Sequence, residues 1–299
     1  MLNDSHCHFF SNQFFTTLSR QRGRGETVEQ LCRELQWDEP GPPDALAERW
    51  IAEMDAQGVG RAALIASVPG DEASVGTAVA RHPDRFVGFF MLDPSADDAV
   101  ERAHNAMETM GLQVLCLFPA MNQVPLHDSR VQQVVEVAAA RAGTAVFMHC
   151  GVLSVGVRRK LGLPSRFDLR LGDPLGVARL AMAYPNLPFI VPHFGAGLFR
   201  EALMAADTAP NIHLDTSSSN SWIKYTPGLT LDAVFKTAVS VVGPRRLLFG
   251  TDSSFYPRGW QRGVYESQKA ALGTVGLSAV DEALIVGGNF DRLFPPRAA

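Results

Sequence analysis

Two histidines separated by one residue lie near the start of the sequence, in the segment NDSHCHFF. Side chains at positions i and i+2 of a strand share a face, so His6 and His8 would point together while Cys7 points the other way. Paired imidazoles are good ligands for a divalent ion such as Zn²⁺. In a chain with eight histidines, such a pair arises by chance in roughly a fifth of cases, so it needs further support.

Three other residues give that support, because each lies at the end of an apolar segment. His149 lies in AVFMHCG, His193 in FIVPHFGAG and Asp252 in LLFGTDSS. Neutral imidazoles with a carboxylate suit one divalent metal ion, with Zn²⁺ as the expected ion and Mn²⁺ as the alternative. Such an ion makes a water molecule acidic enough to act as a nucleophile near neutral pH. The residue types therefore indicate a hydrolytic metal site, provided that the fold brings them together.

The elements that would position these residues alternate regularly between apolar and amphipathic segments. The apolar segments predict eight strands, at residues 2–6, 61–66, 86–92, 112–118, 144–149, 189–193, 212–215 and 246–251. The amphipathic segments predict helices at residues 44–56, 71–81, 96–110, 129–142, 174–184, 199–206 and 231–241. Helical crossovers join parallel strands, so eight such units predict an α/β fold of the (β/α)₈ TIM-barrel type rather than a doubly wound sheet.

We expect a single domain over residues 1–299, since no Pro/Gly/Ser-rich linker divides the chain. The first connection, residues 9–43, is too polar and irregular for one helix, and we expect a long loop insertion that covers the barrel mouth. The segment NFDRLF is predicted to form a last helical turn that packs Leu293 and Phe294 onto the barrel exterior. Functional groups of such barrels lie at the carboxyl ends of strands, where all the candidate residues fall.

Composition narrows the classes of partner. The formal charge is −4 and no run of five like charges occurs, so we predict a small-molecule substrate and no nucleic-acid binding. No signal-peptide pattern and no stretch of 18 apolar residues is present, which predicts a cytoplasmic protein without a membrane span. The cysteines have no C-x-x-C spacing and are predicted to be reduced and buried: Cys7, Cys32, Cys116 and Cys150.

Taken in order, these motifs resemble those of the amidohydrolase superfamily, in the amidohydrolase-related branch that includes aminocarboxymuconate semialdehyde decarboxylase. The resemblance covers nearly the whole chain and rests on DSHCHFF, PDRFVGFF, MHCG, PHFGAG, FGTDSSF and NFDRLF. It implies that four residues hold the metal, namely His6, His8, His149 and Asp252, and that His193 lies beside it without being a tight ligand. The fourth strand, LQVLCLFP, has no lysine of the kind that bridges two ions in binuclear members, so a single metal is implied. Dimers are usual among these relatives, so we also expect a homodimer.

Two enzyme functions remain open at this point. The first is hydrolysis of a lactone, ester or amide of a small organic acid, in which Asp252 accepts the proton of the attacking water and His193 polarises the substrate oxygen. His193 as the base is the alternative assignment. The second function is non-oxidative decarboxylation of an unsaturated or aromatic carboxylate. A non-catalytic binding barrel would predict a broken ligand set, whereas all the expected ligands are present, and we predict hydrolysis.

Substrate recognition is expected to come from loops. Arginines would bind a carboxylated substrate through their two-pronged guanidinium group, and the candidates are Arg20, Arg22, Arg24, Arg158 and Arg159. The segment TSSSNSW, residues 216–222, is a further candidate, in which Trp222 either lines an aromatic wall or anchors its own loop. Gln113 and Val114 stand where many relatives have a basic residue and a glycine, and Ala196 separates two glycines that are often adjacent.

The remaining histidines are expected to have structural roles. His82, His104 and His127 lie in turn-like or polar helical contexts, which predicts surface positions. His213 shares a strand face with Asp215, so it is a candidate to support a metal ligand from behind.

Overall fold

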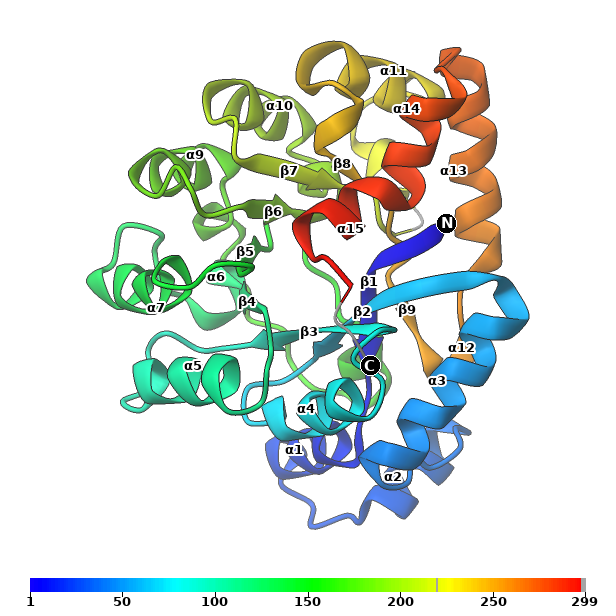
Figure 1. The fold of residues 1–299 in the computed structure, drawn as a ribbon. Helices are drawn as coiled ribbons and strands as arrows, with labels where there is room; N and C mark the ends of the chain where they lie inside the picture. The colour runs from blue at the N-terminus through cyan, green and yellow to red at the C-terminus, as the bar shows by residue number, and fades with distance from the viewer. Residues whose placement is uncertain (219, 297–299) are drawn as a thin grey trace.

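Parallel strands form one continuous sheet in the computed structural model, which describes residues 1–218 and 220–296 (Figure 1). The strands are β1 (Leu2–Phe9), β2 (Val59–Ala66), β3 (Phe86–Met91), β4 (Val114–Leu117), β5 (Ala145–Met148), β6 (Phe189–Val191), β7 (Ile212–Asp215), β8 (Leu247–Leu248) and β9 (Ser253–Ser254). Neighbours in the sheet follow chain order from β1 to β8, and every pairing is parallel.

The sheet closes because β9 pairs with β1 on the side opposite β2. Between β8 and β9, the N–H of Ser5 donates to the carbonyl oxygen of Phe249 at 2.8 Å. β8 and β9 are therefore two parts of one interrupted eighth strand. The predicted (β/α)₈ barrel is confirmed.

Helices connect the strands and surround the sheet (Figure 1). They are α1 (Asn12–Arg22), α2 (Val28–Leu35), α3 (Pro43–Gln57), α4 (Glu72–Arg81), α5 (Ala99–Glu108), α6 (Pro119–Asn122), α7 (Ser129–Ala139), α8 (Gly156–Lys160), α9 (Pro174–Ala183), α10 (Phe199–Thr208), α11 (Leu231–Val242), α12 (Phe255–Arg258), α13 (Arg262–Val275), α14 (Ala279–Ala283) and α15 (Asn289–Leu293). Seven of them overlap the seven predicted helices, and α15 matches the predicted last helical turn. The sequence pattern does not predict α13, because its buried face is short and consists of Gln268, Ala271 and Leu272.

The first connection is not the long loop that we expected, because it contains α1 and α2. Ser11 caps α1 by accepting the N–H of Phe14 at 3.1 Å, and Thr27 and Gln30 form a reciprocal capping box at the start of α2. These capping residues are polar, and they lie within residues 9–43, which were predicted to form a loop because the segment is polar. Apolar side chains of both helices share one buried cluster with Val157, which follows β5, and Arg158 donates to Gln21 of α1. The insertion therefore reaches over the barrel mouth, as predicted.

Inward-facing side chains fill the barrel. On β2, Ile65 joins this interior cluster while Leu64 faces the surrounding helices, as the two-residue period of a strand requires. Phe294 also belongs to the interior cluster, and its ring centroid lies 5.8 Å from that of Phe89. Our prediction that Leu293 and Phe294 pack on the exterior is therefore wrong. Phe290 and Phe294 instead close the amino-terminal end of the barrel, where Arg61, at the start of β2, donates to the carbonyl oxygen of Phe294 at 2.7 Å.

All four cysteines are buried and unbridged, as predicted. Cys7 lies in the apolar layer between strands and helices, on the face of β1 opposite His6 and His8. In the described part of the chain, none of the helices is long and apolar enough to cross a membrane.

A buried carboxylate fastens α1 to the segment after β2. The hydroxyl of Ser11 lies 2.8 and 2.7 Å from the two carboxylate oxygens of Asp71, whose side chain is buried. Burial raises the pKa of Asp71 to about 7, although hydrogen bonds from Ser74 and Ser11 act in the opposite direction. Glu72, whose carboxylate accepts a hydrogen bond from Arg102, adds to the increase.

We expect this carboxyl group to make the protein less stable as pH rises from about 5 to about 7. The folded chain keeps a proton on Asp71 that the unfolded chain releases near its ordinary pKa of 3.8, so the unfolding free energy falls by about 2 kcal/mol across this interval. Asp71→Asn should remove this part of the pH dependence. Urea unfolding of parent and variant at both pH values measures the difference, and an identical pH dependence would contradict the assignment.

Candidate metal centre

His6 and His8 lie on the same face of β1, near its carboxyl end. Their ring centroids are 5.2 Å apart. Between Asp4 and Cys7, β1 uses three residue steps where its partner β2 uses two, which is a β-bulge. Bulges change the direction of side chains and are common next to active sites. This one lies where the two histidines leave the strand.

Asp252 brings a carboxylate against both imidazoles. Its Oδ1 lies 3.1 Å from Nε2 of His8 and 3.6 Å from Nε2 of His6. The ligand atoms of this group of three all lie within 4.8 Å of one another. Asp252 has a φ of 60°, a conformation that costs a non-glycine residue about 1 kcal/mol or more and that clusters at functional sites. The carbonyl oxygen of His6 holds this turn by accepting the N–H of Asp252 at 3.0 Å.

The other nitrogen of each imidazole contacts a residue at or just after the end of another strand. The carboxylate of Asp215, at the end of β7, accepts from Nδ1 of His6 at 2.7 Å. The hydroxyl of Ser67 lies 2.8 Å from Nδ1 of His8, and since it donates to the carbonyl oxygen of Ile65, it accepts from that imidazole. Both Nε2 atoms therefore keep their lone pairs on the side of Asp252. Metal-binding histidines in proteins are oriented in this way.

Asp215→Asn should weaken binding of Zn²⁺ about 10- to 100-fold. The amide removes the negative charge behind His6 and no longer fixes the proton on Nδ1. Competition with a chromophoric chelator measures the affinity, and Asp207→Asn, on the exposed part of α10, is the matched control. Equal affinities in the two variants would show that Asp215 does not support the site.

A buried carboxylate also ties β1 to the segment that carries Asp252. Asp4 Oδ1 accepts the N–H of His6 at 2.9 Å and that of Thr251 at 3.1 Å. Its Oδ2 accepts the Thr251 hydroxyl at 2.5 Å and the indole N–H of Trp260 at 2.7 Å. Burial raises the pKa of Asp4, and these donors oppose the increase. The network fixes the position of His6 relative to Asp252.

His149 lies beside the group of three and is buried. Its ring stacks on Phe118 with 5.1 Å between centroids and lies 5.3 Å from the ring of His193. Burial, and then the neighbouring His193, lower the pKa of His149 well below its usual value, so the ring is neutral. Its Nδ1 is buried without a hydrogen-bond partner among the described residues. A neutral imidazole with an unused buried nitrogen fits a metal ligand, so the donor set fits a divalent ion.

His193 approaches from the end of β6, with a φ of 56°. The hydroxyl of Ser217 lies 2.8 Å from Nδ1 of His193 and 2.9 Å from Nδ1 of His6. Nδ1 of His6 already carries the proton given to Asp215, so it cannot accept another. Within the described residues, His193 is then the remaining acceptor for the Ser217 hydroxyl. This arrangement assigns the ring proton of His193 to Nε2.

The charges around the imidazoles favour a cation. Burial alone would lower the pKa of His6, but the nearby carboxylates, Asp215 first, outweigh burial and raise it. Burial would likewise raise the pKa of Asp252, but the contact with His8, followed by the nearby rings of His6 and His193, holds it below its usual value. Burial lowers the pKa of His193. The field that stabilises a proton on His6 would also attract a metal ion.

Gly151 sets the contact between the segments that carry His149 and His193. A Cβ at this position would lie 2.2 Å from the carbonyl oxygen of Gly195 and 2.4 Å from that of Ala196, and Gly151 has a φ of +68°. Only glycine tolerates both conditions.

We expect Gly151→Ala to lower the unfolding free energy by about 3 kcal/mol, because backbone atoms must move to admit the methyl group. Gly156→Ala is the matched control, since a Cβ there would have no neighbouring atom within 4 Å and its φ is not positive. Chemical denaturation of both variants measures the effect. Equal stability would refute the close approach.

The loop residues expected to contact substrate have varied surroundings. Arg22 forms ion pairs with Glu26 at 2.9 Å and with Glu34 at 2.5 Å, so its guanidinium is already occupied. Arg158 donates to the carbonyl oxygen of Pro164 at 2.8 Å and to Gln21. The remaining arginines are exposed, and a substrate role for them stays a prediction: Arg20, Arg24 and Arg159.

The segment 216–222 contributes Ser217 to the site, while Ser219 lies outside the described residues. Trp222 is buried against Phe199, with 5.8 Å between ring centroids, so it anchors its loop. Of the two roles considered for Trp222, the structure supports the second.

The other histidines mostly lie where they were expected. His82 contacts Glu48, His104 contacts Glu108, and His127 is exposed. His213 does not support a metal ligand. It lies near Arg292 and Arg246, and burial followed by these charges lowers its pKa to about 3.

The sequence patterns do not predict that Asp215, Ser217 and Ser67 orient the imidazoles, although Ser217 lies in the segment expected to contact substrate. The position of Asp215 could have identified it as a residue of the metal site. It ends a predicted strand whose carboxyl end must face the same barrel mouth as His6.

A family model described as Amidohydrolase matches residues 3–295 of the chain. The chain belongs to the amidohydrolase family. This confirms the resemblance seen in the sequence motifs, and it makes the protein an enzyme of a family that uses divalent metals. No curated protein matches this amidohydrolase.

Solved structures of similar fold include both hydrolases and decarboxylases. The 5-carboxyvanillate decarboxylase LigW from Sphingomonas paucimobilis is 19% identical, with a TM-score of 0.66 over 99% of each chain. An amidohydrolase from Burkholderia multivorans with bound zinc is 17% identical, with a TM-score of 0.66 over 99% of this chain and 100% of that one. A probable 2-pyrone-4,6-dicarboxylic acid hydrolase from Acinetobacter baumannii, with citric acid bound, is 14% identical, with a TM-score of 0.60 over 98% of each chain. At these identities, the likeness establishes the barrel fold of this amidohydrolase.

Proposed function

We propose that this amidohydrolase hydrolyses a lactone, ester or amide of a small organic acid, using one divalent metal ion. The observation that carries the proposal is the convergence of two imidazoles and a carboxylate whose ligand atoms lie within 4.8 Å of one another, with the ring of His193 centred 4.9 Å from that of His6. The residues that would hold the ion are His6, His8, His149 and Asp252. Zn²⁺ is the proposed ion and Mn²⁺ the alternative.

When bound, such an ion supplies Lewis-acid chemistry, because it polarises a carbonyl oxygen and acidifies a water molecule. Asp252 is the proposed proton acceptor. Its carboxylate is one third exposed, so water can reach it, and its lowered pKa keeps it ionised near neutral pH. A positioned carboxylate of this kind can take the proton of the attacking water.

His193 is the proposed hydrogen-bond donor. Because Ser217 occupies Nδ1, the nitrogen left to meet substrate is Nε2 with its proton. A neutral donor suits the oxygen on which negative charge develops during attack on a carbonyl group. The same tautomer has no lone pair on Nε2, which argues against His193 as the general base.

Decarboxylation remains the second candidate, because the LigW structure with the same fold is a decarboxylase. In favour of hydrolysis, a probable pyrone dicarboxylic acid hydrolase also shares the fold. The two reactions differ in product. Hydrolysis releases a new acid group without gas, whereas decarboxylation releases carbon dioxide.

A substrate panel separates the two. The protein, loaded in turn with Zn²⁺ and Mn²⁺, is incubated with lactones, esters and amides of small carboxylic acids and with unsaturated and aromatic carboxylic acids. Acid release and carbon dioxide are followed in parallel, with the His6→Ala, His8→Ala variant as the background. We expect acid release from the first group. Carbon dioxide release without hydrolysis would overturn the proposed reaction.

A further inference from the structure

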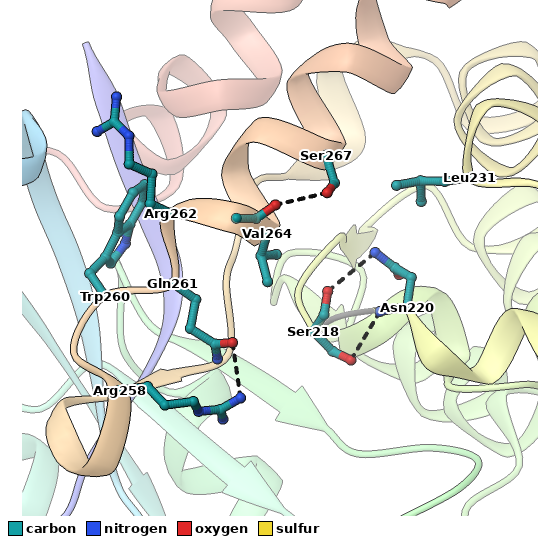
Figure 2. Close-up of a pocket in the computed structure, with 10 residues that line it drawn as sticks. Ser218, Asn220, Leu231, Arg258, Trp260, Gln261, Arg262, Val264 and Ser267 are labelled. Carbon is teal, nitrogen blue, oxygen red and sulfur yellow. Dashed lines mark hydrogen bonds between the residues drawn. The ribbon is translucent and has the colours of Figure 1, made fainter.

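A cavity of about 450 Å³ lies between the segment after β7 and the start of α13 (Figure 2). Ligand pockets for small molecules have volumes of this order. Polar groups of Ser218, Asn220 and Gln261 line it together with the apolar side chains of Val264 and Leu231 (Figure 2).

Arg258 is the cationic side chain that enters this cavity, where it points toward Gln261 (Figure 2). Its Nη1 donates to Oε1 of Gln261 at 3.1 Å. Within residues 1–218 and 220–296, it has no carboxylate partner in an ion pair. Arg262, at the edge of the cavity, differs from Arg258 in its direction and in having a carboxylate partner. Its side chain points away, and it is held by Glu266 and by Gln57, each at 3.1 Å.

The cavity is joined to the candidate metal centre through Gln261. The side-chain amide of Gln261 donates to the carbonyl oxygen of Asp252 at 3.1 Å, while its oxygen accepts from Arg258. On the other wall, Ser218 directly follows Ser217, which contacts His193. A molecule in the cavity would therefore lie one side chain away from Asp252.

We propose that this cavity binds the carboxylate of a small organic acid, with Arg258 as its anchor. A guanidinium without an acidic partner offers paired N–H groups that match a carboxylate. Val264 and Leu231 provide apolar surface for the body of the acid. One unpaired guanidinium beside apolar walls favours a singly charged carboxylate over inorganic phosphate. This inference rests on the proposed function, because it gives the acid part of the substrate a place beside the metal centre.

Benzoate is the test probe, with benzamide as its uncharged counterpart. Titration calorimetry compares the parent, Arg258→Gln and the matched control Arg262→Gln as full-length proteins. We expect benzoate to bind the parent saturably, about tenfold or more weakly to Arg258→Gln, and within about twofold of the parent to Arg262→Gln. Benzamide affinity should not depend on Arg258. Both arginines are exposed, so neither change removes buried contacts.

The same titrations in the metal-free His6→Ala, His8→Ala background separate this inference from the proposed function. There, benzoate cannot bind through the metal, so a preserved difference between the two arginine variants supports the subsite even if hydrolysis fails. Equal benzoate affinity in Arg258→Gln and Arg262→Gln, the absence of saturable binding, or tighter binding of inorganic phosphate than of benzoate would each overturn the subsite. None of these results bears on whether the parent hydrolyses a substrate.

Discussion

The double variant His6→Ala, His8→Ala will lose its divalent metal and, with it, measurable turnover. Nε2 of His6 lies 3.6 Å from Oδ1 of Asp252, and Nε2 of His8 lies 3.1 Å from it. Removing both imidazoles leaves Asp252 as the one remaining ligand of this group of three. A site reduced to Asp252 and His149 lacks the three or more protein ligands that catalytic zinc sites use. Elemental analysis of purified protein, followed by activity on the substrate found in the panel, measures both losses.

The matched control replaces two histidines that lie far from the barrel mouth. His82 and His104 contact surface glutamates, so His82→Ala, His104→Ala should keep the parental metal content. Circular dichroism and the unfolding midpoint show whether each variant folds. Retention of a full equivalent of metal by a folded His6→Ala, His8→Ala protein would exclude the proposed ligands.

His193→Gln will lower kcat by about 10²- to 10⁴-fold while the metal content stays at the parental level. Ser217 occupies Nδ1 of His193, and the assigned ring proton occupies Nε2, so His193 offers the metal no free lone pair, whereas Nδ1 of His149 has no partner among the described residues. Glutamine retains an N–H donor but not the geometry or acidity of the imidazole. Steady-state kinetics and elemental analysis on the same preparation separate loss of catalysis from loss of metal.

His213→Gln is the control for replacing a buried histidine. His213 lies on β7 near Arg292 and Arg246, away from the metal centre, so folded variant protein should keep its parental kcat. If His193→Gln instead lost its metal in proportion to its activity, His193 would be a ligand rather than a hydrogen-bond donor to substrate.

The barrel is predictable from sequence because its signal repeats. Each strand is an apolar segment and each crossover contains an amphipathic one. An error in predicting one strand or helix therefore does not change the predicted alternation of strands and helices. The features that were not predicted, among them three helices and the position of Phe294, each depend on few residues. The capping signals of α1 and α2 consist of Ser11, Thr27 and Gln30 within a polar stretch, and α13 buries only a short face. The sequence does not indicate whether Phe294 packs inside the barrel or on its exterior, because an apolar side chain suits both positions equally.

The candidate ligands were predictable for a different reason. His6, His8, His149 and Asp252 combine a distinctive residue type with a position at a strand end. Asp215 and Ser217 lack such a signature, and they meet His6 across more than 200 residues of sequence. Only the closed barrel, with β1 and β7 opening onto one mouth, reveals that they orient the imidazoles.

Anomalous diffraction from crystals of the parent protein, grown with Zn²⁺ and recorded at the zinc edge, tests the central claim most directly. We expect one anomalous peak, at about one ion per chain, among His6, His8, His149 and Asp252. A folded, active protein with no peak among these residues would contradict it.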